Sequence, residues 1–135
     1  MSGMTSYLQK KLLDDLTGVA AYTTPAPIYL SLHTAAVTDA GSHAAEVSTS
    51  GTGYARQSLA AKIGAADGTT GIAQNSDTIT FGPASASWGT ISHLGIEDAS
   101  SAGNMLLWAQ PSSAKTIASG QSFPFVASQI SIRFD

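Results

Sequence analysis

The sequence predicts a mainly β protein, an antiparallel β-sandwich of jelly-roll or immunoglobulin-like type with a short N-terminal α-helix. Apolar and polar residues alternate over several short segments, which is the period of a half-buried strand. Glycine, proline, asparagine and serine separate these segments, as they do in proteins built from short strands and turns. A single stretch near the N-terminus instead has leucines at helical spacing.

Length and composition indicate one domain with an unusually neutral surface. We expect a single domain over residues 1–135, with a helix and linker in 1–24 and the sandwich in 25–135. Only 11% of the residues are charged, against about 25% in ordinary soluble domains. A surface with little charge is suited to burial against another protein. The net charge of −3 argues against a nucleic-acid partner, and no apolar run is long enough for membrane insertion.

The predicted helix covers about residues 7–17. Residues 6–9 (S-Y-L-Q) fit a capping box with Ser6 at the N-cap, and Gly18 fits the position after the last turn. A helix of this length is marginal alone, so its apolar stripe must dock on the same chain or on a neighbouring subunit. The stripe, which supplies candidate interface residues, consists of Leu8, Leu12 and Leu16.

The remaining elements are predicted as short strands joined by loops. A hairpin is expected from residues 88–96 and 105–109, because the residues between them are rich in turn formers. The segments expected as strands are 28–33, 54–59, 78–81, 88–96, 105–109, 115–118 and 130–135. Their alternation predicts a core of Leu30, Leu32, Ile79, Phe81, Leu94, Ile96, Leu106, Ile130, Ile132 and Phe134. Residues 35–53 and 62–76 are expected as loops.

No motif predicts catalysis, a metal ion or a cofactor. The spacing of His33, His43 and His93 matches no ligand motif. Glu97 and Asp98 are expected in a turn, where aspartate commonly binds local backbone amides. We therefore expect a protein that is not an enzyme and has no catalytic residues.

Tyr54, Arg56 and the two tryptophans are the other candidates for contacts. Tyr54 and Arg56 either anchor an interface or ligand, or Arg56 covers an apolar neighbour at a strand edge. Trp88 and Trp108 could stack on a sugar, but large aromatic residues in a hairpin more often fill the core.

Five segments, in this order, resemble a family of small structural proteins from tailed bacteriophages, often labelled short tail fibre or virion structural proteins. These segments are Y-L-x-x-K-L-L-D (7–14), P-x-P-I-Y-L-S-L-H-T (25–34), G-x-G-Y-A-R-Q (51–57), I-T-F-G-P-A-S-A-S-W-G-T-I-S-H-L-G-I-E-D-A (79–99) and G-N-M-L-L-W (103–108). The resemblance covers nearly the whole chain. It carries over no functional residue.

The resemblance implies a non-enzymatic component of the virion, assembled in the cytoplasm of the bacterial host. We expect a tail fibre, tail-tip or capsid decoration protein that forms a homotrimer and docks on other capsid or tail proteins. The alternative is a sandwich module that binds a host-surface glycan. An exposed tryptophan beside polar loop residues would favour this alternative, and burial of both tryptophans would weaken it.

Overall fold

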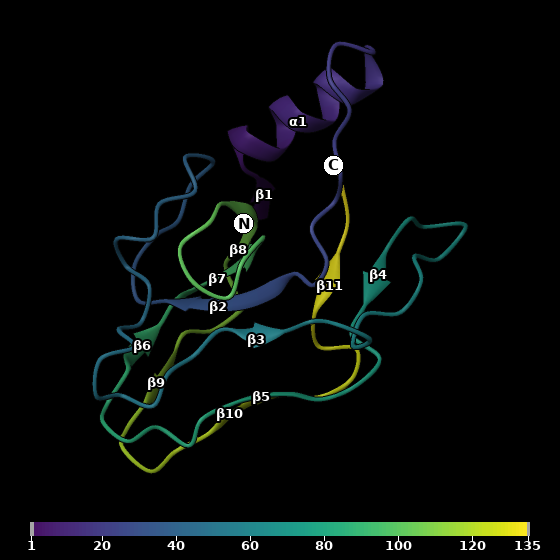
Figure 1. Ribbon diagram of the computed structural model, residues 1–135. Helices are drawn as coiled ribbons and strands as arrows, with labels where there is room; N and C mark the ends of the chain where they lie inside the picture. The colour runs from purple at the N-terminus through teal and green to yellow at the C-terminus, as the bar shows by residue number, and fades with distance from the viewer. Residues whose placement is uncertain (1, 135) are drawn as a thin grey trace.

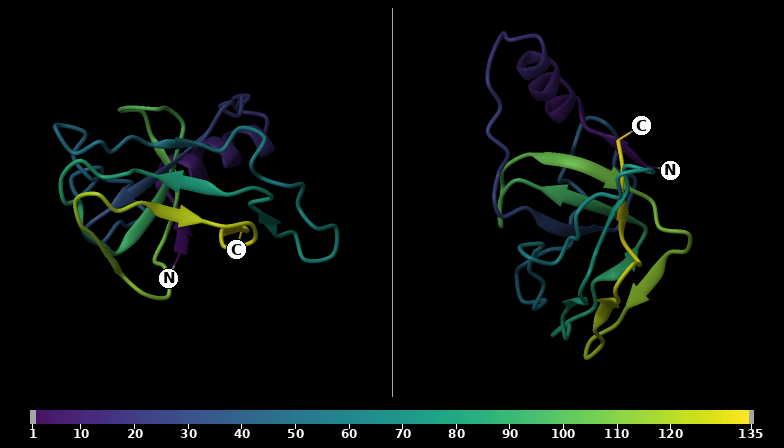
Figure 2. Two further views of the ribbon diagram at one scale, coloured as in Figure 1. Left: turned by 90° about the horizontal axis from the view of Figure 1, so that it is seen from below. Right: turned by 90° about the vertical axis from the view of Figure 1, so that its right-hand side faces the viewer.

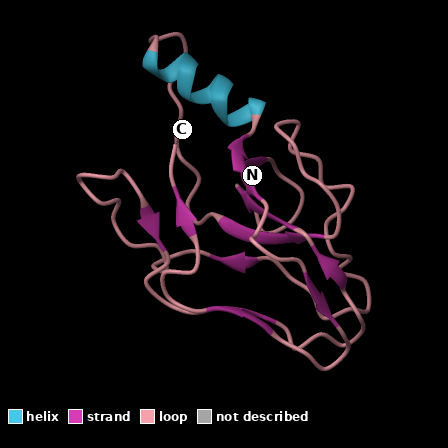
Figure 3. Ribbon diagram, turned by 180° about the vertical axis from the view of Figure 1, so that it is seen from behind, coloured by secondary structure: helices cyan, strands magenta, loops and turns pink. Residues whose placement is uncertain are grey.

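The computed structural model describes residues 2–134 and has the predicted class, a mainly antiparallel β-sandwich with a short N-terminal helix (Figure 1). The helix stands at one end of the molecule, beyond the strands (Figure 3). The elements are β1 (Ser2–Met4), α1 (Ser6–Leu16), β2 (Tyr29–His33), β3 (Gln57–Ser58), β4 (Ala73–Gln74), β5 (Ile79–Phe81), β6 (Gly89–Ile91), β7 (His93–Glu97), β8 (Met105–Ala109), β9 (Lys115–Ile117), β10 (Phe123–Phe125) and β11 (Ser131–Ile132).

The strands form one five-stranded sheet and three two-stranded ladders, all antiparallel (Figure 2). The sheet has the order β1-β8-β7-β2-β3, and the ladders are β10–β5, β11–β4 and β6–β9. The predicted hairpin is present as β7 and β8, with an irregularity in register between Ile96 and Glu97. A bulge of this kind is typical of a place where one strand carries an extra residue.

The core lies between the five-stranded sheet and the ladders. Leu30 and Leu32 of the sheet belong to the same buried cluster as Ile79 and Phe81 of β5. Most of the predicted core is confirmed, while Leu94 and Ile132 are only half-buried. The prediction for Phe134 is wrong: its side chain is 64% exposed, because β11 ends at Ile132.

The segment predicted as one strand over residues 88–96 is divided between two ladders. β6 pairs with β9, whereas β7 pairs with β2 and β8, and Ser92 separates them. Trp88 precedes β6 and is buried in the core. The strands that no pattern predicted, β1, β4 and β10, have only two or three residues each.

The helix begins one residue earlier than expected, and its N-cap is Thr5 instead of Ser6. Thr5 Oγ1 accepts a hydrogen bond from the Leu8 amide at 3.4 Å. The same hydroxyl donates to the Met105 carbonyl in β8 at 2.6 Å. Gly18 ends the helix as predicted, with φ +74° and its amide bonded to the Asp15 carbonyl. Within residues 2–134 no helix has the length and apolar character needed to cross a membrane.

Replacing Thr5 by valine should lower the free energy of unfolding by about 1–2 kcal/mol, because the helix loses its cap and β8 loses a partner for its carbonyl. Ser6→Ala is the matched control, since Ser6 is exposed. It should change stability by less than about 0.5 kcal/mol. Urea unfolding of both variants measures the difference. A larger loss of stability for Ser6→Ala would support Ser6 as the N-cap, as the sequence predicted.

Candidate functional site

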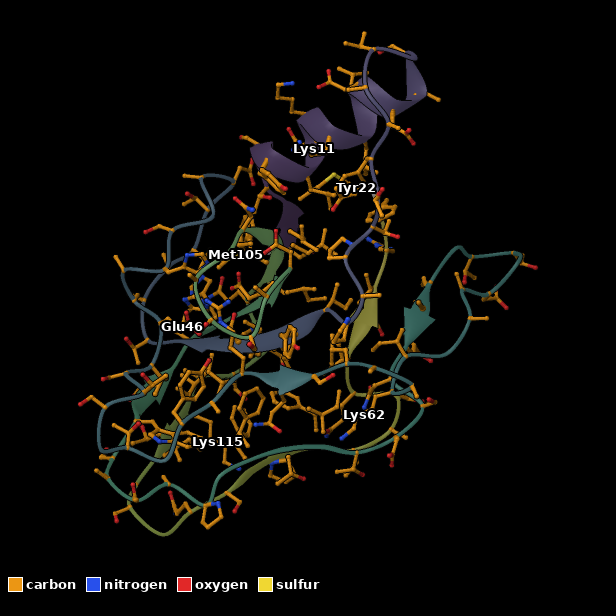
Figure 4. All side chains as sticks on the ribbon, in the orientation of Figure 1. Lys11, Tyr22, Glu46, Lys62, Met105 and Lys115 are labelled. Carbon is orange, nitrogen blue, oxygen red and sulfur yellow. The ribbon has the colours of Figure 1, made fainter. Side chains whose placement is uncertain are left out.

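The second face of the five-stranded sheet carries polar side chains. In β2, Ser31 and His33 alternate with the core leucines and therefore point away from the core. The register places His33 opposite His93 of β7, and Glu97 lies on the same face. All four side chains are buried. Residues 34–56 return over this face, where Glu46 lies beside β2 (Figure 4).

Glu97 is the centre of this buried polar cluster, because several side chains converge on its carboxylate. Ser31 Oγ donates to Oε1 at 2.8 Å, and His43 Nε2 lies 2.8 Å from Oε2. His33 Nε2 is 3.8 Å from Oε1, and the guanidinium of Arg56 is 3.8 Å from Oε2. Strand β2, strand β7 and the covering segment are thus tied to one fully buried carboxylate.

The hydrogen bonds of Ser31 indicate which ring nitrogen of His33 donates to it. The hydroxyl proton of Ser31 is used in the bond to Glu97, so the bond of 2.9 Å between Ser31 Oγ and His33 Nε2 requires the ring nitrogen to donate. His33 therefore carries a proton on Nε2. Its Nδ1 is buried and has no hydrogen-bond partner.

Arg56 ties the covering segment to the hairpin turn. Its Nε and Nη2 donate to the two carboxylate oxygens of Glu46, both at 2.7 Å, which is a bidentate pair. Its Nη1 donates to the carbonyls of Ala99 and Ala102 at 2.8 Å. The Tyr54 hydroxyl donates to Glu46 Oε1 at 3.0 Å and accepts the Leu32 amide at 3.0 Å. Arg56 therefore links Glu46 to the hairpin turn, and Tyr54 links Glu46 to β2.

Gly95 leaves the room that the cluster needs. A Cβ atom at this position would lie 2.5 Å from Ser31 Oγ and 2.9 Å from Glu97 Oε1. These distances are shorter than any normal contact. Any residue other than glycine at position 95 would therefore displace the hydrogen bond between Ser31 and Glu97.

The surroundings keep Glu97 ionised. Burial alone would raise the pKa of the Glu97 carboxyl, but the His33, His43 and Ser31 side chains and the charge of Arg56 outweigh it and hold the pKa below its usual range. Burial raises the pKa of Tyr54, so its hydroxyl remains protonated and able to donate to Glu46. Burial, followed by the neighbouring His33, lowers the pKa of His93.

This arrangement supports structure and gives no access to a substrate. Ser31, His33 and Glu97 include the residue types of a nucleophile and a base, but each is fully buried, so no substrate can reach the serine oxygen. Among residues 2–134 no group of three or more histidine and carboxylate side chains is placed to hold a metal ion. What the cluster can do is hold residues 34–56 and the turn 98–104 firmly on the sheet.

The structure separates the five candidate contact residues into two groups. Tyr54 and Arg56 come together through Glu46 and are buried, with partners inside the chain. The leucine stripe lies on α1, where Leu8 is buried in the core, Leu12 is half-buried and Leu16 is 85% exposed. The stripe therefore docks on the same chain at its start and is free of it at its end. A role of these residues in an interface stays a prediction.

Sequence reasoning missed Glu97, Glu46, Ser31 and His43 as members of one cluster. Glu97 was expected in a turn, but β7 extends through it and buries its side chain. One signal was present in the sequence. Ser31 and His33 alternate with leucines, and charged residues are rare in the chain. Glu97, which directly follows a predicted strand, is therefore an unusual charge that indicates a polar partner.

An apolar groove lies on the other side of the sheet, between β7, β8 and the C-terminal segment. Its volume is about 320 Å³, and its floor is formed by Leu94, Ile96 and Leu107 of β7 and β8. Ile130 and Ile132 at the C-terminal end form part of its wall. The described residues at both ends of the chain line it, and the two ends lie near each other in Figure 2, right.

Neither tryptophan is available as a stacking platform. Trp88 lies against Tyr54 in an edge-to-face arrangement, and its Nε1 donates to the Thr52 carbonyl at 2.8 Å. Trp108 donates to Asp39 at 2.9 Å. Both rings are more than nine-tenths buried, which weakens the glycan-binding alternative.

Comparison with known proteins agrees with the sequence resemblance. The family model described as podophage GP4 fiber I protein gp80 matches residues 3–133. No curated protein matches the chain. The match includes the helix, both faces of the five-stranded sheet and all three ladders. Because it covers nearly the whole chain, the protein belongs to the Gp80 family of podophage fibre structural proteins.

Proposed function

We propose that this protein is a non-enzymatic subunit of the phage virion that acts by self-association and by docking on other capsid or tail proteins. The observation that carries the proposal is the family match over residues 3–133. In this role the sandwich is a rigid body that presents contact surfaces. The tail fibre or tail tip is its location, with capsid decoration as the alternative place, and subunits assemble in the cytoplasm of the bacterial host.

Three features of the structure support a geometric role. The buried polar cluster around Glu97 fixes the longest loop to the sheet, so that the loop has one shape. The surface carries few charges, so that little desolvation opposes contact between copies. Leu13, Leu16 and Val19 are exposed together at the end of α1. Exposed apolar clusters of this kind commonly mark interaction sites.

The wild-type protein should sediment as a homotrimer, with three times the 13.7 kDa mass of one chain. Closed cyclic symmetry is the usual solution for identical subunits, and three copies suit the axis of a fibre. Sedimentation equilibrium from low to high micromolar concentration measures the mass directly. A monomer throughout this range would contradict intrinsic self-association. The position of the protein in a reconstruction of intact particles then distinguishes tail from head.

A further inference from the structure

The segment between β3 and β4 contains a tight turn at residues 67–71, which we call the Asp67 turn. The amide of Asp67 donates to the Ile72 carbonyl at 2.9 Å, and the Gly71 amide donates to the Asp67 carbonyl at 2.8 Å. All five residues of the turn are exposed. In Figure 1 this part of the chain projects outward beside β4. The turn is therefore open to water on the outside of the molecule.

The first two residues of the turn, Asp67 and Gly68, form a reactive pair. The sequence contains this aspartate–glycine pair once, and every other aspartate within the chain precedes a residue that has a side chain. Glycine has no Cβ atom to hinder its backbone nitrogen from approaching the carboxyl carbon of the preceding aspartate. Within residues 2–134 no group accepts a hydrogen bond from the Gly68 amide. The nitrogen is therefore free to react.

The reaction open to this pair is a rearrangement of the backbone. The Gly68 nitrogen attacks Cγ of Asp67, a C–N bond forms, the C–OH bond of the protonated carboxyl group breaks, and the N–H proton leaves with the hydroxyl as water. The product is a five-membered succinimide. Water then adds to the main-chain carbonyl carbon of the ring and breaks its bond to nitrogen, which leaves the chain connected through Cγ as isoaspartate. One water is released and one is consumed, so no other reactant is needed.

The Asp67 turn opposes this reaction through the Asp67 carboxylate. Its Oδ1 accepts hydrogen bonds from the Thr70 amide at 2.7 Å, the Thr70 hydroxyl at 2.9 Å and the Thr69 amide at 3.0 Å. These bonds, the Thr70 amide first, hold the pKa of the Asp67 carboxyl below its usual range. The ionised carboxylate is the unreactive form, because the departing oxygen must carry a proton. The bonds thus slow the first step.

We propose that Asp67–Gly68 is a site of spontaneous isoaspartate formation and that the Thr70 hydroxyl restrains its rate. The product has one more methylene group in the main chain at position 67. Because the Asp67 amide and carbonyl both close the turn, this extra length alters the shape of the projecting loop. The inference concerns one covalent bond of a single chain and does not depend on the proposed self-association.

Digestion with the endoproteinase that cleaves before aspartate, and not before isoaspartate, measures the reaction. Unmodified protein gives the fragments 39–66 and 67–76, whereas isoaspartate at position 67 leaves an uncut fragment 39–76. After incubation of the folded protein at mildly acidic pH, this uncut fragment should accumulate with time. Mass spectrometry identifies it, and enzymatic methylation of isoaspartate establishes its chemical nature.

Substitutions in the turn test the role of each residue. Thr70→Val removes the hydroxyl and should increase the rate of accumulation several-fold, whereas Thr70→Ser keeps the hydroxyl and should retain the wild-type rate. Thr69→Val is the matched control, because Thr69 binds Asp67 through its backbone amide, which the substitution leaves in place.

Gly68→Ala should suppress the uncut fragment. A Cβ atom at position 68 would meet nothing within 4 Å, so alanine fits the folded turn and hinders only the attack. Circular dichroism establishes that each variant is folded.

The outcomes decide the site and the restraint separately. An uncut fragment that accumulates in the wild type, faster in Thr70→Val and slower in Gly68→Ala, supports both. No accumulation in either the wild type or Thr70→Val, or equal accumulation in Gly68→Ala, overturns the site. Equal rates in Thr70→Val and Thr69→Val overturn the restraint by the Thr70 hydroxyl.

Discussion

Replacing Glu97 by glutamine should lower the free energy of unfolding by about 3–5 kcal/mol, as expected when one partner of a buried charged cluster is removed. Both oxygens of Glu97 face donors, Ser31 on one side and His43 on the other. An amide presents one oxygen and one NH2 group, so its NH2 group would face a donor. The variant would also leave Arg56 with Glu46 as its one neighbouring carboxylate. Urea unfolding near pH 7 measures the loss.

The matched control is Asp77→Asn, which makes the same chemical change at an exposed position. It should change stability by less than about 0.5 kcal/mol. Equal effects of the two substitutions would show that Glu97 is solvated and that the buried polar cluster does not hold the covering segment.

The free energy of unfolding of the wild type and of Glu97→Gln should depend differently on pH. The folded state holds the pKa of Glu97 below the value of about 4.3 expected in the unfolded chain. The contribution of Glu97 is therefore fully present above this value and is lost as the pH falls toward the lower pKa of the folded state. Wild-type stability should fall between pH 6 and pH 3 more steeply than that of Glu97→Gln. Parallel curves would contradict a lowered pKa.

Regular periodicity made part of the fold predictable. Strands β2, β5 and β7 alternate apolar side chains with other residues over three to five positions, β8 is a short apolar run, and the helix has leucines four residues apart. The alternating strands direct their apolar side chains to the core, so the pattern in the sequence follows from the packing. The hairpin was predictable for a second reason, since its turn contains the residues that reverse a chain.

The shortest strands could not be predicted because two or three residues have no period. β1 pairs with β8 and β10 pairs with β5, so their partners lie far away in the sequence. β10 also contains Pro124, which lacks an amide hydrogen and usually argues against a strand. It is tolerated here because β10 belongs to a ladder of only two strands.

The start of the helix shows the same limit at a single position. Thr5 and Ser6 are both suitable caps by residue type. The bond from Thr5 to the Met105 carbonyl, which lies 100 residues away, distinguishes between them. The local sequence contains no information about that carbonyl.

The polar cluster was hidden because alternation does not distinguish a wet face from a covered one. The alternation of Ser31 and His33 with leucines predicted a strand, but it contained no sign that a loop covers their face. The path of residues 34–56 is irregular, so no pattern predicted where Glu46 and Arg56 would meet. Arg56 was singled out because charge is rare in this chain, and Tyr54 because tyrosine, like arginine, is common in contacts. This reasoning found part of the cluster without its centre.

Replacing Phe81 by alanine should lower the free energy of unfolding by about 3–5 kcal/mol, the usual loss for a fully packed aromatic side chain. Phe81 is completely buried in β5. Its ring stacks on Tyr54 with centroids 6.0 Å apart and meets Phe125 edge to face at 6.2 Å. Tyr54 in turn meets Trp88 edge to face at 5.6 Å, so Phe81 is one of four connected aromatic rings and its removal opens a cavity between Tyr54 and Phe125.

Phe134→Ala is the control of the same residue type. It also tests whether the Phe134 side chain is buried, as the sequence predicted, or exposed, as in the structure. The alternation of residues 130–134 predicted a buried Phe134, whereas its side chain is 64% exposed. In the monomer the substitution should therefore cost less than about 0.5 kcal/mol. Urea unfolding at low protein concentration, where any oligomer has dissociated, compares the two variants. A loss for Phe134→Ala as large as that for Phe81→Ala would mean that the strand continues past Ile132 and that the C-terminal wall of the groove closes over the core.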